Sequence, residues 1–343
     1  MVHASSLNGI IIMKSPLLFD VNNISVKLFR NFKEINEKDF LCFYRKIFGK
    51  AFSKDTFVWF DRLTNENIWA IAIENESDKY VGLYGLLPLK FYLSGGECGG
   101  YLCHNVGVEL KYAGTGLFQY IGKYILGKVL RSNEIAISFP NRLASRGHKA
   151  IGWKDMGSML FYEKTEFNNN SKLDDKSVHE VDEFPKSLNK LLLKLRDGVD
   201  FSLKKDVSFL NWRISKPDHE YKCYVYNKGN KIYGYMILKF FCDNDNIGKG
   251  HIIDIQAEDK ATLKSLLKKV ENVKKRMNLN LLNMWVFEGS ELLKTIESEG
   301  YKRSDDDYDY PLILYLKDND LADQFVKLNK KKILISLADN DVF

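Results

Sequence analysis

Hydrophobic and polar residues along this chain follow two spacings, and both occur between Tyr101 and Val129. Tyr101–Val108 is a mostly apolar run typical of a buried strand, and a glycine-containing turn follows at Ala113–Gly116. Beyond the turn, apolar residues recur every four positions, at Leu117, Ile121, Ile125 and Val129. That spacing places them on one side of an amphipathic helix. We therefore predict a strand, a tight glycine turn and a helix in direct succession.

Similar patterns predict further elements on both sides of this stretch. In the first half they are a helix over Asn36–Phe48, strands over Ile68–Ile73 and Tyr80–Leu93, a strand over Ile135–Phe139, a short helix over Arg142–Ala150 and a strand over Met159–Glu163. Residues 167–183 are rich in Asn and Asp with few apolar residues, which indicates a linker. After the linker, helices and strands follow in a similar order up to Leu316.

The two halves of the chain also match residue by residue. A gap-free shift of 152 positions aligns Phe57 with Phe209, Trp69 with Tyr221, and Gly82 with Gly234. Self-similarity at a fixed shift indicates an internal repeat, although chance similarity between two sheets is the alternative. We predict a leader over 1–23, a domain over 24–166, a linker over 167–183 and a second domain over 184–343.

The glycine turn has the composition of an anion-binding site. A strand that passes through such a turn into a helix directs backbone N–H groups and the positive helix end outward. The second half has no glycine at the equivalent place, where it reads IIDIQAEDKATLKSLL. Glu258 and Asp259 would repel a phosphate there. We therefore expect the second domain to be structural or substrate-shaping.

Two motifs around this turn resemble those of a known family. VELKYAGTGLF, residues 108–118, resembles the V-x-P-x-Y-R-G-x-G-L-F/G motif of the GNAT superfamily of acyl-CoA-dependent acyltransferases. NRLASRGHKAIGW, residues 141–153, has Asn141, Ala144 and Gly152 at the spacing of a second GNAT motif. The resemblance implies an α/β (α+β) fold with two tandem GNAT-like domains, each a mixed, mostly antiparallel sheet flanked by helices.

The resemblance also implies an acyl-CoA site. Its pantetheine arm would lie along Val106, Gly107 and Val108, and Asn141 would help to hold that arm. Its pyrophosphate would bind the loop of Ala113, Gly114, Thr115, Gly116, Leu117 and Phe118. Ala113 stands where the family usually has Arg, and Phe118 where it usually has Gly or Ala. The first change removes a cation, and the second would crowd the start of the helix.

The implied reaction is a direct transfer in which an amine attacks the thioester carbonyl. His148 occupies the position where the family commonly has a Tyr as general acid, and histidine can donate a proton near neutral pH. The alternative for His148 is an exposed helix histidine. His104 and Glu109 are possible general bases, and a buried core histidine is the alternative for His104. The terminal carboxylate of Phe343 is a further possibility, because tandem GNAT enzymes of the Eis type use such a group.

The composition of the chain limits which binding partners and which cellular compartment are expected. The net charge of +6 suits an anionic ligand, and no basic stripe interleaved with aromatic residues points to nucleic acid. No apolar run is long enough for a membrane span. Five cysteines without a C-x-x-C pair favour reduced thiols in the cytoplasm, and we expect no metal site. Asp305, Asp306 and Asp307 are interpreted as a solvated turn.

The favoured function is an acetyl-CoA-dependent N-acetyltransferase, with acetyl-CoA or another acyl-CoA as cosubstrate. Its acceptor would be a small amine or an amino-sugar, such as a nucleotide-linked sugar of surface polysaccharide synthesis. One alternative is a non-catalytic protein that kept the fold and lost acyl-CoA turnover. Another is a Fem-type aminoacyl ligase, which also pairs two GNAT-like domains. The sequence does not determine the oligomeric state.

Overall fold

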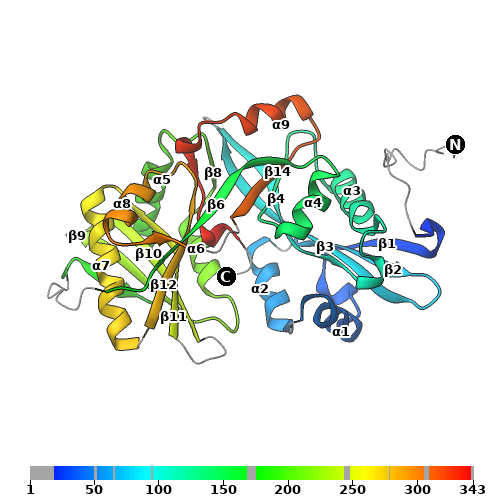
Figure 1. Cartoon of the computed structure of the whole chain (residues 1–343), viewed down its shortest axis with the longest axis horizontal. Coiled ribbons are helices and arrows are strands. Elements are labelled where there is room, and N and C mark those ends of the chain that lie inside the picture. Colours follow the sequence, from blue (N-terminus) through cyan, green and yellow to red (C-terminus); the bar gives the residue numbers. More distant parts are fainter. Residues whose placement is uncertain are drawn as a thin grey trace. The chain divides into compact units, whose positions relative to one another are not determined.

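A computed structural model describes residues 19–49, 52–64, 66–93, 96–167, 175–242, 248–277, 279–304 and 309–340. It divides into two compact units (Figure 1). The first comprises the chain up to Lys90, Cys98–Met156 and Pro311–Val326. The second comprises Phe91–Glu97, Gly157–Tyr310 and the chain from Lys327. Most of the predicted leader, the Asp305–Asp307 run and Phe343 lie outside the described residues.

The first unit is a sheet with helices. Its strands are β1 (Ile24–Phe29), β2 (Ile68–Glu74), β3 (Lys79–Leu93), β4 (Gly96–Val108), β5 (Ile135–Ser138) and β14 (Tyr310–Tyr315), in the order β1-β2-β3-β4-β5-β14. Its helices are α1 (Glu37–Phe48), α2 (Lys54–Thr64), α3 (Leu117–Val129), α4 (Arg142–Lys149) and α9 (Asn319–Val326). β4 and β5 run parallel, whereas β1–β2, β2–β3 and β5–β14 are antiparallel.

The second unit repeats this plan. Its main sheet has the order β6 (Lys154–Lys164), β12 (Leu279–Phe287), β11 (Gly248–Ala257), β10 (Lys231–Cys242), β9 (Tyr221–Lys228) and β7 (Val178–Val181). The short strand β13 (Lys302–Arg303) pairs with β6, whereas β8 (Phe201–Leu203) pairs with β15 (Ile333–Leu334) and with Phe91–Leu93 of β3. The helices are α5 (Asn189–Arg196), α6 (Val207–Ile214), α7 (Lys260–Met277) and α8 (Leu292–Ser298). The mixed, mostly antiparallel sheets confirm the predicted fold class.

The order of elements recurs along the chain. The helix–strand–strand–strand–helix–strand–helix run from α2 to α4 recurs from α6 to α8. Gly82 of β3 and Gly234 of β10, which the shift of the sequence aligns, both lie against the helix that follows the next strand: Gly82 faces Ile121 and Gly234 faces Leu266.

The last strand of each copy differs from the prediction. Met159–Glu163 was expected to close the first sheet, but β6 pairs antiparallel with β12 of the second unit. Leu312–Leu316 was expected in the second sheet, but Ile313 of β14 pairs with Ser138 of β5. An apolar strand needs a neighbouring strand with which to pair. In each sheet, the position of the last strand is taken by the last strand of the other copy. The compact units therefore do not follow the predicted boundaries at 166 and 184.

The predicted stripe of α3 forms the core of the first unit. Leu117, Ile121 and Ile125 are at most 1% exposed and pack with strand residues such as Ala70 and Tyr84. Burying large aliphatic side chains in this way contributes about 1.5–3 kcal/mol for each of them. This packing fixes the start of α3 next to the end of β4, where the glycine turn lies.

Candidate functional site

The candidate site begins where two parallel strands of the first unit separate. β4 pairs with β5 only from Gly100–Ile135 to Leu102–Ile137. β5 ends at Ser138, whereas β4 continues to Val108. Val106, Gly107 and Val108 therefore have no β5 residue opposite them, so one edge of β4 is available to a ligand that pairs with backbone groups.

Asn105 of β4 has an unusual backbone conformation. Its φ of 47° lies in the left-handed region, which is uncommon for a residue other than glycine. Its side chain is held from both sides. Tyr44 OH donates to Asn105 Oδ1 at 2.7 Å, and Asn105 Nδ2 lies 2.8 Å from Nδ1 of His104. The sequence analysis did not single out Asn105, although Asn is the non-glycine residue that tolerates this conformation best.

The glycine turn leads directly into α3. Gly114 and Gly116 have φ values of 75° and 95°, and Gly116 is the N-terminal cap residue of α3. No side chain caps this end, and the first turn of the helix carries no acidic residue. The first N–H groups of a helix have no partner within it, and they carry partial positive charge. The turn can therefore hold an anion with backbone groups.

The residues just before the turn are anchored to the sheet. Tyr112 OH donates to Glu74 Oε1 at 2.7 Å, and Lys111 Nζ lies 2.6 Å from the same oxygen. The hydrogen bonds from Lys111, Ser77 and Tyr112 lower the pKa of Glu74 to about 2. Lys111 is thus engaged with Glu74, and this leaves the anion-binding role to the backbone.

The structure accommodates Phe118, the residue expected to crowd the start of α3. α3 and α4 lie side by side (Figure 1), and the Phe118 ring lies against Gly147 of α4. A Cβ added at Gly147 would come within 2.6 Å of this ring. A bulky residue on one helix is therefore matched by a missing side chain on the other. Ala113 is exposed and leaves its position without a cation, as expected.

His148, the predicted general acid, is fully buried, so the alternative of an exposed histidine is wrong. It lies among the rings of Tyr84, Phe118 and Trp153, at 5.6, 5.1 and 4.8 Å between centroids. Its Nδ1 is 3.0 Å from Tyr84 OH. Burial lowers the pKa of His148 to about 3, so the ring is neutral near pH 7. The predicted acid role stays untested, and this environment opposes it.

His104, a predicted base, is 2% exposed and stacks on Phe60 at 4.6 Å. Its Nδ1 faces Asn105 Nδ2, and its Nε2 lies 3.0 Å from Oδ1 of Asn67. Because an amide nitrogen only donates and an amide oxygen only accepts, this pattern fits a neutral ring with the proton on Nε2. Successive residues of a strand point to opposite faces of the sheet, so the side chains of His104 and Cys103 lie on different faces. Cys103 packs with Tyr84 and with residues of α3 in one hydrophobic core. His104 and His148 therefore lie on opposite faces.

The remaining predicted residues lie at the ends of the strands. Glu109 follows β4, is 8% exposed and forms a 2.7 Å ion pair with Lys46 of α1. Asn141 is the N-cap of α4, and its Oδ1 accepts a hydrogen bond from the N–H of Ala144 at 2.9 Å. Leu117 is buried in the core, so Ala113–Gly116 and the first N–H groups of α3 form the exposed part of the loop.

The second unit has the same separation of strands, but its helix start is occupied. β11 and β12 pair in parallel from Gly248–Leu279 to Ile252–Met284. Asp259 Oδ1 accepts the N–H of Thr262 at 2.7 Å. Glu258 forms ion pairs with Lys194 and Lys231. These carboxylates therefore lie at the helix start that carries no acidic residue in the first unit.

The C-terminal segment enters the same opening. Its 3₁₀ turn, Leu337–Asp339, contacts both β11 and β12. Lys205 Nζ lies 2.8 Å from Asp254 Oδ2 and 3.0 Å from Asp339 Oδ1, and all three side chains are buried. Burial raises the pKa of Asp339 to about 6, against the opposing effect of Lys205. Arg213 donates to the carbonyl oxygens of Ala338 and Asn340, both at 3.1 Å.

Solved structures share this architecture across both halves. A GCN5-related N-acetyltransferase from Anabaena variabilis matches at 14% identity and a TM-score of 0.65, over 86% of this chain and 73% of that one. The N-myristoyltransferase of Saccharomyces cerevisiae with bound myristoyl-CoA matches at 10% identity and 0.61, over 94% and 92%. A putative acetyltransferase from Pyrococcus horikoshii matches at 12% and 0.59, over 93% and 95%. The chain has the GNAT fold.

No protein-family model and no curated protein matches the sequence, so the likeness is one of fold. The glycine turn lies between β4 and α3, where the sequence pattern predicted a strand, a turn and a helix in succession. In the part of the chain that the structure describes, no group of three or more His, Cys, Asp or Glu side chains could hold a metal ion. No described helix is long and apolar enough to cross a membrane.

Proposed function

We propose that the first unit binds acyl-CoA and transfers its acyl group to an amine. The observation that supports this most is the open anion site at the start of α3, next to an unpaired edge of β4. In this arrangement the N–H groups of the glycine turn would bind the pyrophosphate. The backbone of Val106–Val108 would pair with the amide groups of the pantetheine arm.

In the proposed reaction, the amine nitrogen attacks the thioester carbonyl carbon. The carbon–nitrogen bond forms, the carbon–sulfur bond breaks, and the amine proton is lost as the thiolate gains one. Glu109, at the end of β4, is the proposed base, and its carboxylate forms an ion pair with Lys46. A neutral His104 is the second choice, because both of its nitrogens already have partners.

The finer proposal is acetyl-CoA as donor and a small amine or amino-sugar as acceptor. Limited space beside β4 supports a short acyl group. On the face of the sheet that carries His104, the rings of Phe60 and Trp69 contact His104, and each residue is only 1% exposed. The burial of His148 favours a second candidate function, a protein that binds acyl-CoA without turning it over. Turnover assays with amine panels distinguish the two.

The test is calorimetric titration of acetyl-CoA into the whole protein and into Gly116→Trp. A bulky side chain at this left-handed position should abolish binding. Gly127→Trp is the matched control, because it lies on the same helix and a Cβ there meets nothing within 4 Å. Binding that is lost in Gly116→Trp and kept in Gly127→Trp supports the proposal. Absence of binding to the unmodified protein contradicts it.

A further inference from the structure

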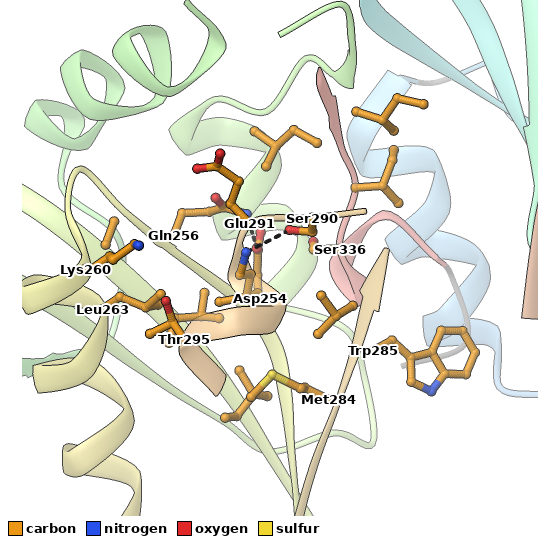
Figure 2. A pocket seen from close by; sticks show the side chains of 18 of the residues that line it. Asp254, Gln256, Lys260, Leu263, Met284, Trp285, Ser290, Glu291, Thr295 and Ser336 are labelled. Carbon is orange, nitrogen blue, oxygen red and sulfur yellow. Dashed lines mark hydrogen bonds between the residues drawn. The ribbon is translucent and has the colours of Figure 1, made fainter. Parts of the chain in front are cut away.

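The second unit contains a cavity of about 310 Å³ where β11 and β12 separate (Figure 2). It is bounded by these strands, by the starts of α7 and α8, and by Ile333–Ser336 of the C-terminal segment. Cavities that bind small molecules begin at about 300 Å³. All of its lining residues belong to the second unit. Its ligand can therefore be inferred from this unit alone.

Three of the acidic side chains around the cavity already have partners within the protein. Asp254 at its base receives hydrogen bonds from Lys205 and from Tyr235 OH, both at 2.8 Å. Glu258 is paired with two lysines, and Asp259 caps α7. A phosphate-bearing ligand such as a nucleotide would meet these carboxylates at the helix start. The cavity is therefore unsuited to CoA, although it lies in the equivalent opening.

Two exposed groups of opposite charge remain on the wall of the cavity. Figure 2 shows the Lys260 ammonium and the Glu291 carboxylate around the same opening. They form no ion pair with each other or with another described residue, unlike Glu258. The Thr295 hydroxyl, on a side chain that is 4% exposed, lines the wall between the strands and α8. Lys331 adds a second ammonium group to the lining.

Aliphatic side chains form one part of the remaining lining, beside Gln256, Trp285, Ser290 and Ser336. Leu263 of α7 and Met284 and Val286 of β12 are buried and line the cavity, as does Ile333 of the C-terminal segment. A ligand that fits must therefore present a positive group, a negative group and an apolar part within a small volume. An amine alone would leave Lys260 without a partner, and a carboxylic acid alone would leave Glu291 without one.

We propose that this cavity binds a small zwitterion, namely a free α-amino acid with an aliphatic side chain. Its carboxylate binds Lys260, its ammonium group binds Glu291, and its side chain packs against Leu263, Met284 and Val286. This site is separate from the acyl-CoA site of the first unit and does not depend on the proposed activity. Charged hydrogen bonds of this kind give the site its selectivity.

The test is calorimetric titration of the full chain with L-leucine, L-methionine and L-valine, and with two analogues of leucine. 3-Methylbutylamine lacks the carboxylate, and 4-methylpentanoate lacks the amine. We expect at least one amino acid to bind, and leucine to bind about tenfold or more tightly than either analogue, since each analogue leaves one charged group unpaired. No binding of all three amino acids, or equal binding of an analogue, overturns the proposal.

Charge-neutralising variants test the two assigned contacts. Lys260→Gln and Glu291→Gln should each weaken leucine binding about tenfold, by removing one charged hydrogen bond. Lys260→Gln should leave 3-methylbutylamine binding unchanged or stronger. Lys327→Gln and Glu183→Gln, at exposed positions outside the cavity, are the matched controls. If the controls weaken binding as much as the test variants do, the contacts are assigned wrongly.

Discussion

The two copies of the repeat share their strands and helices but differ at one place, the opening between the two parallel strands. In the first copy the opening ends at glycines, and the start of α3 has no acidic residue. In the second, Asp259 caps the helix and a buried turn of the C-terminal segment contacts both strands. The fold thus tolerates either an open or a filled cleft. What a copy can bind depends on its loop and on what fills its opening.

Breaking the buried cluster that holds the C-terminal segment should have the largest effect. Lys205→Met leaves the carboxylates of Asp254 and Asp339 without their cation, which should cost about 3–5 kcal/mol of the free energy of unfolding. Chemical denaturation measures this change, with Lys327→Met as control. Adding Asp254→Asn and Asp339→Asn should recover part of the loss. A Lys205→Met variant as stable as the control would show that the cluster does not hold the segment.

The pH dependence of stability should have opposite directions in the two copies. His148 has a pKa of about 3 in the folded state against 6.5 for an ordinary histidine, so the unfolded chain binds the extra proton. Stability should therefore fall as the pH drops from about 6.5 toward 3, by an amount on the order of 4 kcal/mol. Asp339, with its pKa raised to about 6, should instead lose stability as the pH rises from about 4 to 6.

Denaturation curves of His148→Phe and Asp339→Asn, measured from pH 4 to pH 7, separate these two contributions. Relative to His148→Phe, the unmodified protein should lose free energy of unfolding as the pH falls. Relative to Asp339→Asn, it should gain free energy of unfolding as the pH falls. Differences that do not vary with pH would contradict the burial of these groups.

The match between Phe118 and Gly147 predicts a smaller effect. Gly147→Ala adds a methyl group within 2.6 Å of the Phe118 ring and should cost about 1–3 kcal/mol through overpacking. Phe118→Leu in the same chain should reduce that cost. Gly127→Ala is the control, because a Cβ there meets nothing and should stabilise its helix by up to about 1 kcal/mol. Equal effects of the two alanine substitutions would show that the helices do not depend on this pairing.

The smallest effect concerns the cation missing from the first copy. Ala113→Arg places a guanidinium group beside the proposed pyrophosphate site. It should tighten acetyl-CoA binding about two- to fivefold at low salt, as expected for an exposed ion pair. Calorimetry at low and high salt checks this, because screening should remove the gain. A gain that persists in high salt would mean that the introduced side chain acts by packing.

Local patterns predicted the glycine turn and the stripe of α3 because each depends on residues close together in the chain, and the repeat was visible because the two halves keep matching residues at a fixed shift. They could not show which sheet Leu312–Leu316 joins, since an apolar strand pattern indicates burial but not a partner. The same limit hid the Lys205–Asp254–Asp339 cluster, whose members look like separate surface charges. His148 lies beside Arg146 and Lys149 and so looks exposed, yet its side of α4 faces Phe118.

The exchange of final strands between the copies has a consequence for biosynthesis. The first sheet needs β14, so Ser138 cannot find its partner Ile313 until the chain as far as β14 has left the ribosome. Until then β5 presents an unpaired edge, the kind of surface that pairs with other chains. A nascent first half is therefore expected to be a client for chaperones, whereas an ordinary tandem protein could complete its first domain while the second was still being made.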